Sequence, residues 1–276
     1  MITIELMGGL GNQLFQIFAV IGYSLQHKIP FFFQDKGLQH GWRKTLYWDT
    51  LLSSLKPRMM MVDVNNIWRE QQFEYAQIPY VGNTYIKLFG YFQSYKYFDA
   101  YKKEIFDLIQ IHSAKRELLG KLDHIDLKNT LSMHFRVGDY KALPEHHPIL
   151  PLSYYEQSLT RICEDTKRDD WTVLYVCEEE DVAFVNANFI DKLKVRFPNM
   201  TFQKLNGNLA DWEQMLAMSL CCHNIIANST FSWFGAYFNT RSDRKVYYPS
   251  VWFGPAQGKK YMGDLFPREW NKIEIN

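Results

Sequence analysis

The sequence predicts an α/β protein in which parallel strands alternate with helices. A strand, a glycine turn and a helix open the chain, and strand and helix patterns alternate again from residue 130 to residue 248. Its 276 residues correspond to roughly two domains at about 150 residues each. Because 47% of the residues are hydrophobic and 22% are charged, the composition is that of a globular protein.

The first elements form a strand–helix–strand unit. Residues 2–6 have the character of a strand, and the apolar residues after the glycine turn recur at helical spacing as far as Lys28: Leu14, Phe18, Ile21 and Leu25. Residues 29–33 are expected to form the next strand, parallel to the first. Residues 34–100 are rich in aromatic side chains but show no sustained period, so mixed structure is expected there.

The second half repeats strand and helix. Strands are expected at 130–135, 171–177, 201–202, 223–227 and 245–248, and helices at 153–164, 209–222 and 231–239. Ser153 is the expected N-cap of its helix, with Glu156 at the capping-box position. The acidic residues 178–181 stand where another helix begins, and we interpret them as its solvated first turn.

No low-complexity linker or internal repeat is visible in the sequence. The polar stretch at residues 115–130, which precedes a new strand, is the best candidate for a domain boundary. We expect an N-terminal α/β domain at 1–125 and a C-terminal Rossmann-like domain at 126–276, with the C-terminal residues packing back across the boundary.

Charge and cysteine usage exclude several classes of protein. The net charge is +1, whereas nucleic-acid-binding proteins present a strongly basic face, so only a local basic pocket is expected. The four cysteines form no C-x-x-C pair, which excludes the common zinc and redox motifs and predicts reduced, buried thiols. The chain shows no secretory signal and no apolar run long enough to span a membrane. A cytoplasmic location is expected, peripheral membrane contact stays open, and the oligomeric state is not predicted.

The first candidate site is the glycine turn, because glycines allow a backbone to approach an anion at a helix N-terminus. Its candidate ligand-binding residues are Gly9, Gly11, Asn12 and Gln13. The side-chain amides of Asn12 and Gln13 are expected to face a cleft. The G-x-G-x-x-G spacing is incomplete, since Leu14 stands at the last position, and a tight structural turn is an equal alternative.

The second candidate is the segment from His134 to Tyr140, which leaves a strand and enters a loop at Gly138. Strand alternation places His134 and Arg136 on one side and Phe135 and Val137 on the other. An arginine at the carboxyl end of a parallel strand reaches the edge where α/β sheets bind ligands, and its planar fork can grip two diphosphate oxygens. Asp139 is expected to hold the guanidinium or the loop. The alternative is an ordinary ion pair at a strand end.

The third candidate follows the strand at 223–227. Asn228, Ser229, Thr230 and Phe231 stand at a strand-to-helix junction, where short polar side chains and free amides offer an anion seat. Simple helix capping is the alternative. Asp211, near the start of the preceding helix, is a candidate for accepting a hydrogen bond from a base or ribose, although acidic residues are common in first turns.

No metal site is predicted. The chain lacks a D-x-D motif for a divalent cation bound to a diphosphate, and it also lacks H-E-x-x-H and G-x-S-x-G. A metal-free diphosphate clamp is best suited to binding a nucleotide-sugar and neutralising its leaving diphosphate.

Three blocks together resemble the signatures of the α-1,2-fucosyltransferases, glycosyltransferase family eleven. They are the glycine turn through Gln16, the H-x-R-x-G-D-Y segment from His134, and residues 222–236. The resemblance implies a GT-B-like pair of Rossmann-type domains facing a central cleft, with the N-terminal domain on the acceptor side and the C-terminal domain binding the donor. It further implies an inverting, metal-independent enzyme that uses no cofactor and transfers L-fucose from GDP-fucose to the 2-hydroxyl of a terminal galactoside of an oligosaccharide acceptor.

The resemblance also assigns roles to the candidate residues. Arg136 would stabilise the departing β-phosphate, His134 and Asp139 would support the nucleotide and the arginine loop, and Gly11 and Asn12 would border the transferred sugar. Ser229, Thr230 and Phe231 would complete the diphosphate seat.

One departure leaves the donor open. The family pattern usually reads H-x-R-R-G-D, but Val137 occupies the second arginine position, so Lys141 or Arg268 would have to replace that charge. An arginine at position 137 is accordingly expected to raise affinity for GDP. A transferase using another nucleotide-sugar and a non-catalytic protein that binds glycans or nucleotides, with aromatic side chains as platforms, are the two alternatives. No general base stands out among Asp139, Glu145 and His146.

Overall fold

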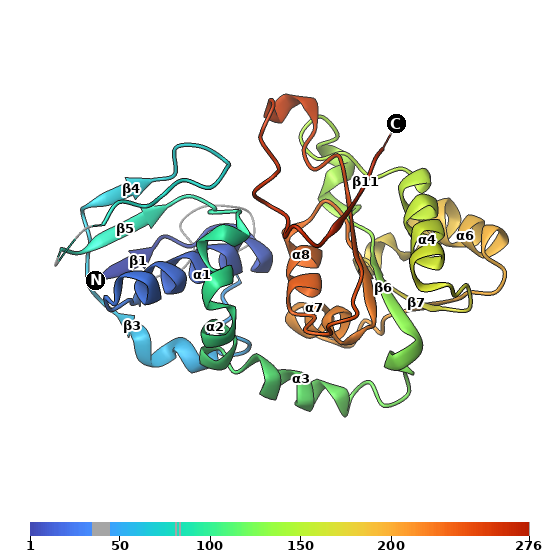
Figure 1. The fold of residues 1–276 in the computed structure, drawn as a ribbon, viewed down its shortest axis with the longest axis horizontal. Coiled ribbons are helices and arrows are strands. Elements are labelled where there is room, and N and C mark those ends of the chain that lie inside the picture. The colour runs from blue at the N-terminus through green and yellow to red at the C-terminus, as the bar shows by residue number, and fades with distance from the viewer. Residues whose placement is uncertain (35–44, 81, 83, 276) are drawn as a thin grey trace. The chain divides into compact units, whose positions relative to one another are not determined.

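The chain forms two compact units (Figure 1). The structure is a computed structural model that describes residues 1–34, 45–80, 82 and 84–275. Unit 1 comprises Met1–Arg116 and Lys260–Arg268, and unit 2 comprises Glu117–Lys259 and Glu269–Asn276. The first change of unit therefore falls within helix α3 (Ile111–Leu119). The last 17 residues are divided between the units, eight of them (Glu269–Asn276) returning to unit 2.

Unit 1 contains a parallel sheet with the strand order β1–β5–β4: β1 (Ile2–Ile4), β5 (Ile86–Phe89) and β4 (Ile67–Arg69). Helix α1 (Leu10–His27) follows β1 and packs against it, with its apolar residues buried. The predicted second strand is reduced to backbone bonds between Ile2 and residues 30–32, before β2 (Phe33–Gln34) pairs with β3 (Met59–Met60). The strand–helix–strand unit and its parallel direction are confirmed.

The remainder of unit 1 consists of short elements, in keeping with the missing period in the sequence. They are the 3-10 turns η1 (Ser53–Arg58), η2 (Tyr95–Tyr97) and η3 (Asp99–Tyr101), and helices α2 (Lys102–Leu108) and α3. The segment 260–268 is hydrogen-bonded to the rest of unit 1 through Asp264. Its carbonyl accepts from Ser94 Oγ at 2.7 Å, and its carboxylate accepts from the Tyr75 amide at 3.2 Å. The part of the 34–100 expectation that falls on residues 35–44, 81 and 83 lies outside the described residues.

Unit 2 contains six parallel strands within its described residues, in the order β11–β10–β9–β6–β7–β8. Their bounds are β6 (Thr130–His134), β7 (Thr172–Val176), β8 (Thr201–Lys204), β9 (His223–Ile225), β10 (Val246–Pro249) and β11 (Asn271–Ile273). Each of the five predicted strands is present, and β11 is an addition that the sequence pattern did not predict. The parallel α/β architecture is therefore confirmed.

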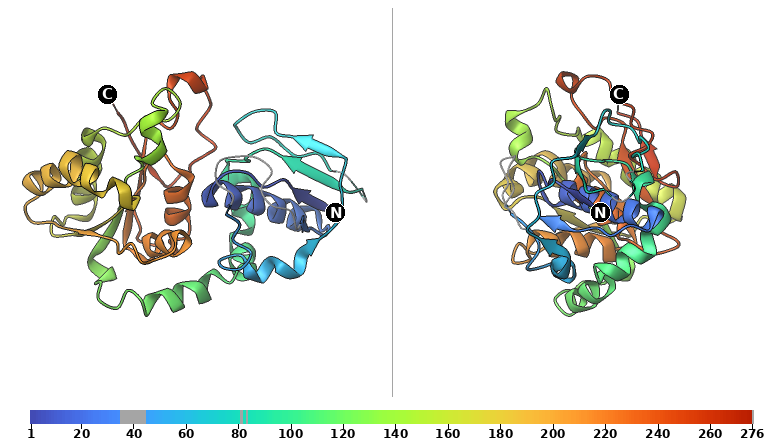
Figure 2. Two further views of the ribbon diagram at one scale, coloured as in Figure 1. Left: turned by 180° about the vertical axis from the view of Figure 1, so that it is seen from behind. Right: turned by 90° about the vertical axis from the view of Figure 1, so that its left-hand side faces the viewer.

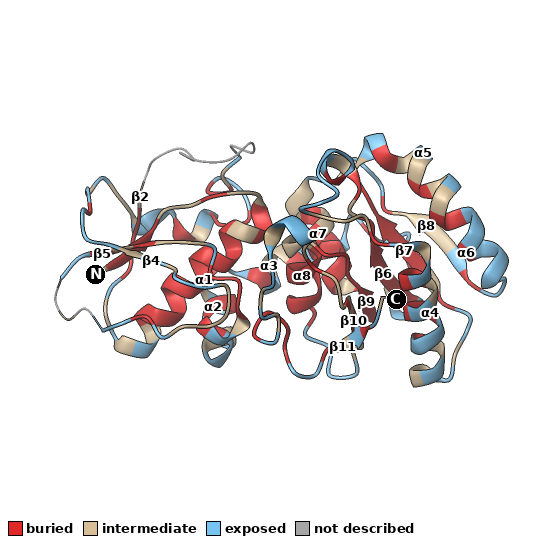
Figure 3. Cartoon of the chain, turned by 90° about the horizontal axis from the view of Figure 1, so that it is seen from above, coloured by how far each residue is buried: buried red, intermediate tan, exposed pale blue. Residues whose placement is uncertain are grey.

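Helices cover both faces of this sheet. One face carries α4 (Leu152–Thr166), α5 (Val182–Val185), the π-helical turn η7 (Asn186–Ile190) and α6 (Asp191–Arg196), and the other carries α7 (Asp211–Leu220) and α8 (Thr230–Tyr237) (Figures 1 and 2). Burial is concentrated on the strands and on the helix faces that meet them (Figure 3). The predicted N-cap Ser153 is wrong, because α4 begins at Leu152 after Pro151, and no side chain caps it.

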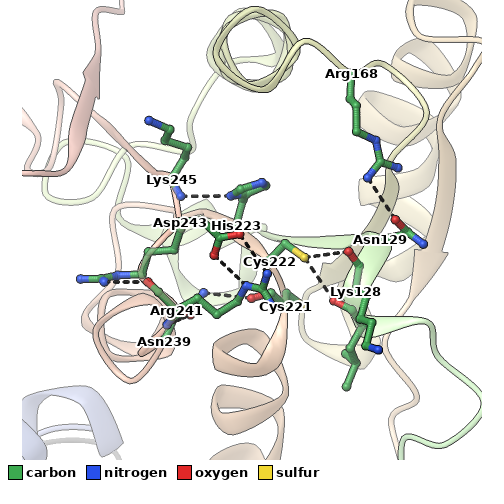
Figure 4. Close-up of polar contacts among 12 residues, drawn as sticks. Lys128, Asn129, Arg168, Cys221, Cys222, His223, Asn239, Arg241, Asp243 and Lys245 are labelled. Carbon is green, nitrogen blue, oxygen red and sulfur yellow. Dashed lines mark hydrogen bonds and ion pairs between the residues drawn. The ribbon is translucent and has the colours of Figure 1, made fainter.

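A network of polar contacts joins the amino ends of the central strands, around the start of β9 (Figure 4). The Lys245 amide donates to His223 Nδ1 at 3.0 Å, and Cys222 Sγ lies 3.0 Å from the Lys128 carbonyl oxygen. All four cysteines are free; three are buried, as expected, and Cys163 is partly exposed. Along the described ranges, no helix combines the length and the apolar character needed to cross a membrane.

Candidate functional site

The carboxyl ends of β6, β7 and β9 bring the second and third sequence blocks together. These strands are neighbours in the sheet and run parallel, so the segments that leave them emerge at one edge. β6 leads into the arginine loop, β9 leads to the first turn of α8, and β7 leads into the acidic residues 178–181. The hydroxyl of Tyr140 donates to the Asn228 carbonyl at 2.9 Å and so joins two of these segments directly.

Arg136 is held by two carboxylates. Its Nη1 donates to Glu178 Oε1 at 2.5 Å, its Nη2 pairs with Asp139, and its guanidinium carbon lies 5.2 Å from the centre of the Tyr140 ring. Burial alone would lower the pKa of Arg136, but the charges of Glu178 and Asp139 more than offset it and raise the pKa. The side chain is only 14% exposed, so the sheet edge carries a fixed, permanently charged fork.

Two residues of the acidic run support this loop. Asp181 is buried and accepts hydrogen bonds from the Gly138 amide at 2.6 Å and from Lys141 Nζ at 2.7 Å, while Glu178 reaches Arg136. The solvated-turn interpretation is therefore wrong for Glu178 and Asp181, although it holds for the exposed Glu179 and Glu180. A sequence signal existed, because this run leaves a buried strand just as Arg136 does.

Two buried polar atoms at this edge have no hydrogen-bond partner among the described residues: His134 Nδ1 and Asn228 Oδ1. Burial, together with the charge of Arg136, lowers the pKa of His134 to about 3, so its imidazole is neutral at physiological pH. Its ring lies 5.4 Å, centre to centre, from that of Phe231. Since buried polar groups are nearly always paired, two unpaired atoms at the ends of neighbouring strands indicate a place that a ligand or water completes.

The junction before α8 is a capped helix start. Ser229 is the N-cap and its Oγ accepts from the Phe231 amide at 3.3 Å, while Thr230 and Phe231 are partly exposed in the first turn. The side-chain Nδ2 of Asn228 donates to the Pro148 carbonyl at 2.9 Å, which fixes the turn to a neighbouring loop. The capping alternative thus describes Ser229, and the partly exposed Thr230 and Phe231 follow it in the first turn.

Asp211 is the first residue of α7 and follows the loop that leaves β8. Its Oδ1 accepts a hydrogen bond from the Trp212 amide at 2.7 Å. Glu213, two residues on, accepts from the Ala210 amide at 2.9 Å and pairs with Lys121 at 2.5 Å. Asp211 therefore has the geometry of a first-turn acid, and it lies at the same carboxyl edge as the other candidates.

Val137 does not point toward the arginine fork. It is 2% exposed and belongs to the core cluster that also contains Phe135 and Leu150, as strand alternation predicts. An arginine here would bring its charge into the core, which removes the structural basis for the expectation that it would strengthen GDP binding. Lys141, in the same loop, pairs with the buried Asp181 at 2.7 Å, whereas Arg268 belongs to unit 1.

The glycine turn lies in unit 1, between β1 and α1. Gly8 has a φ of +75°, and a Cβ there would lie 2.5 Å from Asn12 Nδ2, so this position requires glycine. Gly9 is the N-cap of α1 and Gly11 is buried. Gln13 is fully buried and donates to the Gly8 and Thr45 carbonyls at 3.0 and 2.9 Å. The expectation that its amide faces a cleft is wrong; Asn12, by contrast, is partly exposed.

The described residues contain no group of three or more His, Cys, Asp or Glu side chains that could hold a metal ion. The carboxylates nearest the fork are already bonded to Arg136, Lys141 and a backbone amide.

Comparison with known proteins places the chain among glycosyltransferases. It is 34% identical over 188 residues to the O-antigen biosynthesis glycosyltransferase WbnK of Escherichia coli, a match that spans 64% of this chain and 58% of that protein. It is 27% identical over 299 aligned positions to the alpha-1,2-colitosyltransferase of Escherichia coli, with 99% of both chains covered.

A solved structure, a mutant of Arabidopsis thaliana FUT1 in complex with GDP, is similar with a TM-score of 0.47 and 13% identity over 96% of this chain and 74% of that one. The model of the family described as Glycosyl transferase family 11 matches residues 1–274, and the sequence resemblance is confirmed. The chain is therefore a glycosyltransferase and belongs to glycosyl transferase family 11.

Proposed function

We propose that the enzyme transfers L-fucose from GDP-fucose to the 2-hydroxyl of a terminal galactoside, with inversion and without a metal ion. The acceptor is a growing surface glycan, a proposal supported by the O-antigen role named for its relative WbnK. The observation that carries the proposal is the guanidinium of Arg136, fixed at the carboxyl edge of a parallel sheet between Glu178 and Asp139.

In this mechanism Arg136 stabilises the charge that develops on the diphosphate as the bond to the sugar breaks. A charge-assisted hydrogen bond contributes about 1.5–3 kcal/mol, and two parallel bonds from one fork also fix the orientation of the leaving group. Asp139 is 59% exposed and Glu178 is 36% exposed, so we expect Asp139 to give way to a phosphate oxygen and Glu178 to keep holding the guanidinium. The first turn of α8, where Thr230 and Phe231 are partly exposed, would supply further donors.

We propose a GT-B-like organisation in which unit 2 binds the donor and unit 1 binds the acceptor. The six-stranded parallel sheet with helices on both faces supports a Rossmann-type assignment for unit 2. For unit 1 the support is a parallel βα unit whose glycine turn lies at the carboxyl end of β1.

We propose that the same fork makes a metal ion unnecessary. Arg136 and Lys141 place two cations in one loop, which takes the part that a divalent ion plays at other diphosphate sites. The nearby carboxylates act as their counter-ions.

A colitosyl donor is the second candidate, favoured by the end-to-end similarity to a colitosyltransferase. Colitose is L-fucose without its 3-hydroxyl, so the same diphosphate clamp serves both donors. A binding protein without catalytic activity is no longer an alternative, because the chain belongs to a family of glycosyltransferases.

The test is product analysis by mass spectrometry. Purified protein is incubated in EDTA with GDP-fucose or GDP-colitose and a panel of β-galactosides, and the linkage of the product is then determined by NMR. A gain of one deoxyhexose with GDP-fucose establishes the proposal and metal independence together. A gain of one dideoxyhexose that occurs only with GDP-colitose replaces the donor, and transfer that requires added Mg²⁺ contradicts the metal-free mechanism.

A further inference from the structure

Unit 1 has its own carboxyl edge, where three loops meet. The glycine turn leaves β1, the loop at residues 90–93 leaves β5, and Glu70 directly follows β4. Because the three strands are parallel and adjacent, these segments emerge on the same side of the sheet. Glu70 is an acidic residue at this edge, and the loop at residues 90–93 that contacts it is hydrogen-bonded to side chains of the first sequence block.

The carboxylate of Glu70 is fixed by backbone amides. Its Oε2 accepts from the Tyr91 amide at 2.7 Å and its Oε1 accepts from the Phe92 amide at 3.0 Å. Gly90 has a φ of +155°, and a Cβ there would lie 2.4 Å from the Glu70 Cβ, so the loop approaches the carboxylate because this residue is glycine. Phe92 has a φ of +52°, which is strained for an aromatic residue, and such strain is concentrated at functional sites.

The first sequence block braces this loop. Gln16 is fully buried; its Oε1 accepts from the Met7 amide and its Nε2 donates to the Gly90 carbonyl, both at 3.0 Å. Gln93 Nε2 donates to Asn12 Oδ1 at 2.9 Å. Asn12 and the Glu70 loop therefore form one connected polar structure, half-buried at the strand ends.

The electrostatic setting suits a proton acceptor. Burial raises the pKa of Glu70, and the hydrogen bonds from the two backbone amides and the charge of Lys260 offset only part of this rise. Tyr97 is a further titratable group that interacts with Glu70, and burial raises the pKa of Tyr97, which is neutral at physiological pH. A carboxylate can accept about four hydrogen bonds, so about two acceptor positions remain beside the two hydrogen bonds from backbone amides.

We propose that Glu70 binds the reacting hydroxyl of the acceptor sugar and takes its proton, which makes it the general base of the transfer. This inference rests on the proposed function. The hydroxyl O–H bond breaks and its proton passes to the carboxylate, the hydroxyl oxygen bonds to the anomeric carbon, and the carbon–oxygen bond to the diphosphate breaks with its electron pair leaving on GDP. Glu70 then releases the proton to water.

The test measures kcat and kcat/KM against pH for the full-length wild type, Glu70→Gln and Glu70→Asp, using the donor established for the wild type and a β-galactoside. A positioned general base contributes about 10²–10⁴-fold, so Glu70→Gln should lower kcat by at least a hundredfold and abolish the decline in rate on the acidic side. Glu70→Asp keeps a carboxylate and should retain that decline at a reduced rate. GDP affinity, measured by calorimetry, should be unchanged in both variants.

Asp264→Asn is the matched control, since Asp264 is another largely buried carboxylate of unit 1 that accepts from a backbone amide. It should lower thermal stability and leave the pH profile intact. The inference is overturned if Glu70→Gln remains folded and keeps the acidic decline, or if its kcat stays within tenfold of the wild type. Absence of sugar transfer by the wild type would instead refute the proposed function, whatever the Glu70 variants do.

Discussion

Glu178 and Arg136 form a direct ion pair, with 2.5 Å between Oε1 and Nη1, although 42 residues separate them along the chain. They leave the carboxyl ends of neighbouring strands, β7 and β6, and the parallel register of those strands brings them together. Gly138 permits the approach, because a Cβ at this position would lie 2.6 Å from Glu178 Oε2. The glycine in the loop and the order of the strands together fix the orientation of the Arg136 guanidinium.

Glu178→Gln should lower kcat/KM about tenfold or more, because one charge-assisted bond to Arg136 becomes a weaker neutral one and the fork loses its fixed direction. Steady-state kinetics with the donor varied measures this loss. Glu179→Gln is the matched control, since its carboxylate is exposed and pairs with Lys204 at the surface. Equal losses in the two variants would show that Glu178 does not position the fork.

Arg136→Ala should abolish measurable turnover and weaken GDP binding about 10- to 100-fold, which is the expected effect of losing a charge-assisted fork. Arg136→Lys keeps the charge but not the planar geometry and should be intermediate. Calorimetry with GDP and a thermal melt of each variant are the measurements. The thermal midpoint should change little, because the partners of Arg136 are partly exposed. A folded Arg136→Ala protein with wild-type GDP affinity would remove the residue from the donor site.

Val137→Arg should destabilise the fold by several kcal/mol, because it places a charge and a larger side chain in the core of unit 2. Soluble yield and thermal midpoint report the effect, and Val137→Ile, which keeps the position apolar, provides the comparison. An arginine variant as stable as the wild type would mean that this side chain can leave the core and reach the loop surface.

Stability should decline in mildly acidic solution. The pKa of His134 is about 3 in the folded protein and near 6.5 in the unfolded chain, so between these values the unfolded state binds the extra proton. The contribution of His134 to the free energy of unfolding is therefore fully present above about pH 6.5. It is lost progressively as the pH falls toward 3, and the loss at pH 5 is ~2 kcal/mol. Burial lowers the pKa of His223 to about 4, which acts in the same direction.

Urea unfolding at pH 7 and pH 5 tests this sign. Relative to the wild type, His134→Gln should lose less stability between the two pH values. A wild type that gains stability at pH 5, or a His134→Gln protein with the same loss, would contradict the account.

Several features were predictable from the chain alone because they depend on short-range chemistry. Hydrophobic period and turn residues located α1, α4, α7, α8 and five of the strands of unit 2, β6 to β10, and Phe135 and Val137 faced the core as alternation requires. The pattern failed where the period was absent, as in residues 45–100, and where Pro151 rather than Ser153 preceded a helix. The three sequence blocks identified the family without any structure.

Tertiary structure alone decided which of these residues meet. The sequence determined that Arg136 stands at a strand end, but the order β9–β6–β7 determined that Glu178, Asp181 and Asn228 surround its loop. Gln13 likewise was expected to face a cleft, but packing buries it, and the pairing of β5 with β1 and β4 brings the loop that holds Glu70 to Asn12 and Gln16 of the first sequence block. The physical reason is that periodicity and capping act over a few residues, whereas ion pairs and burial depend on which strands become neighbours after the chain has folded.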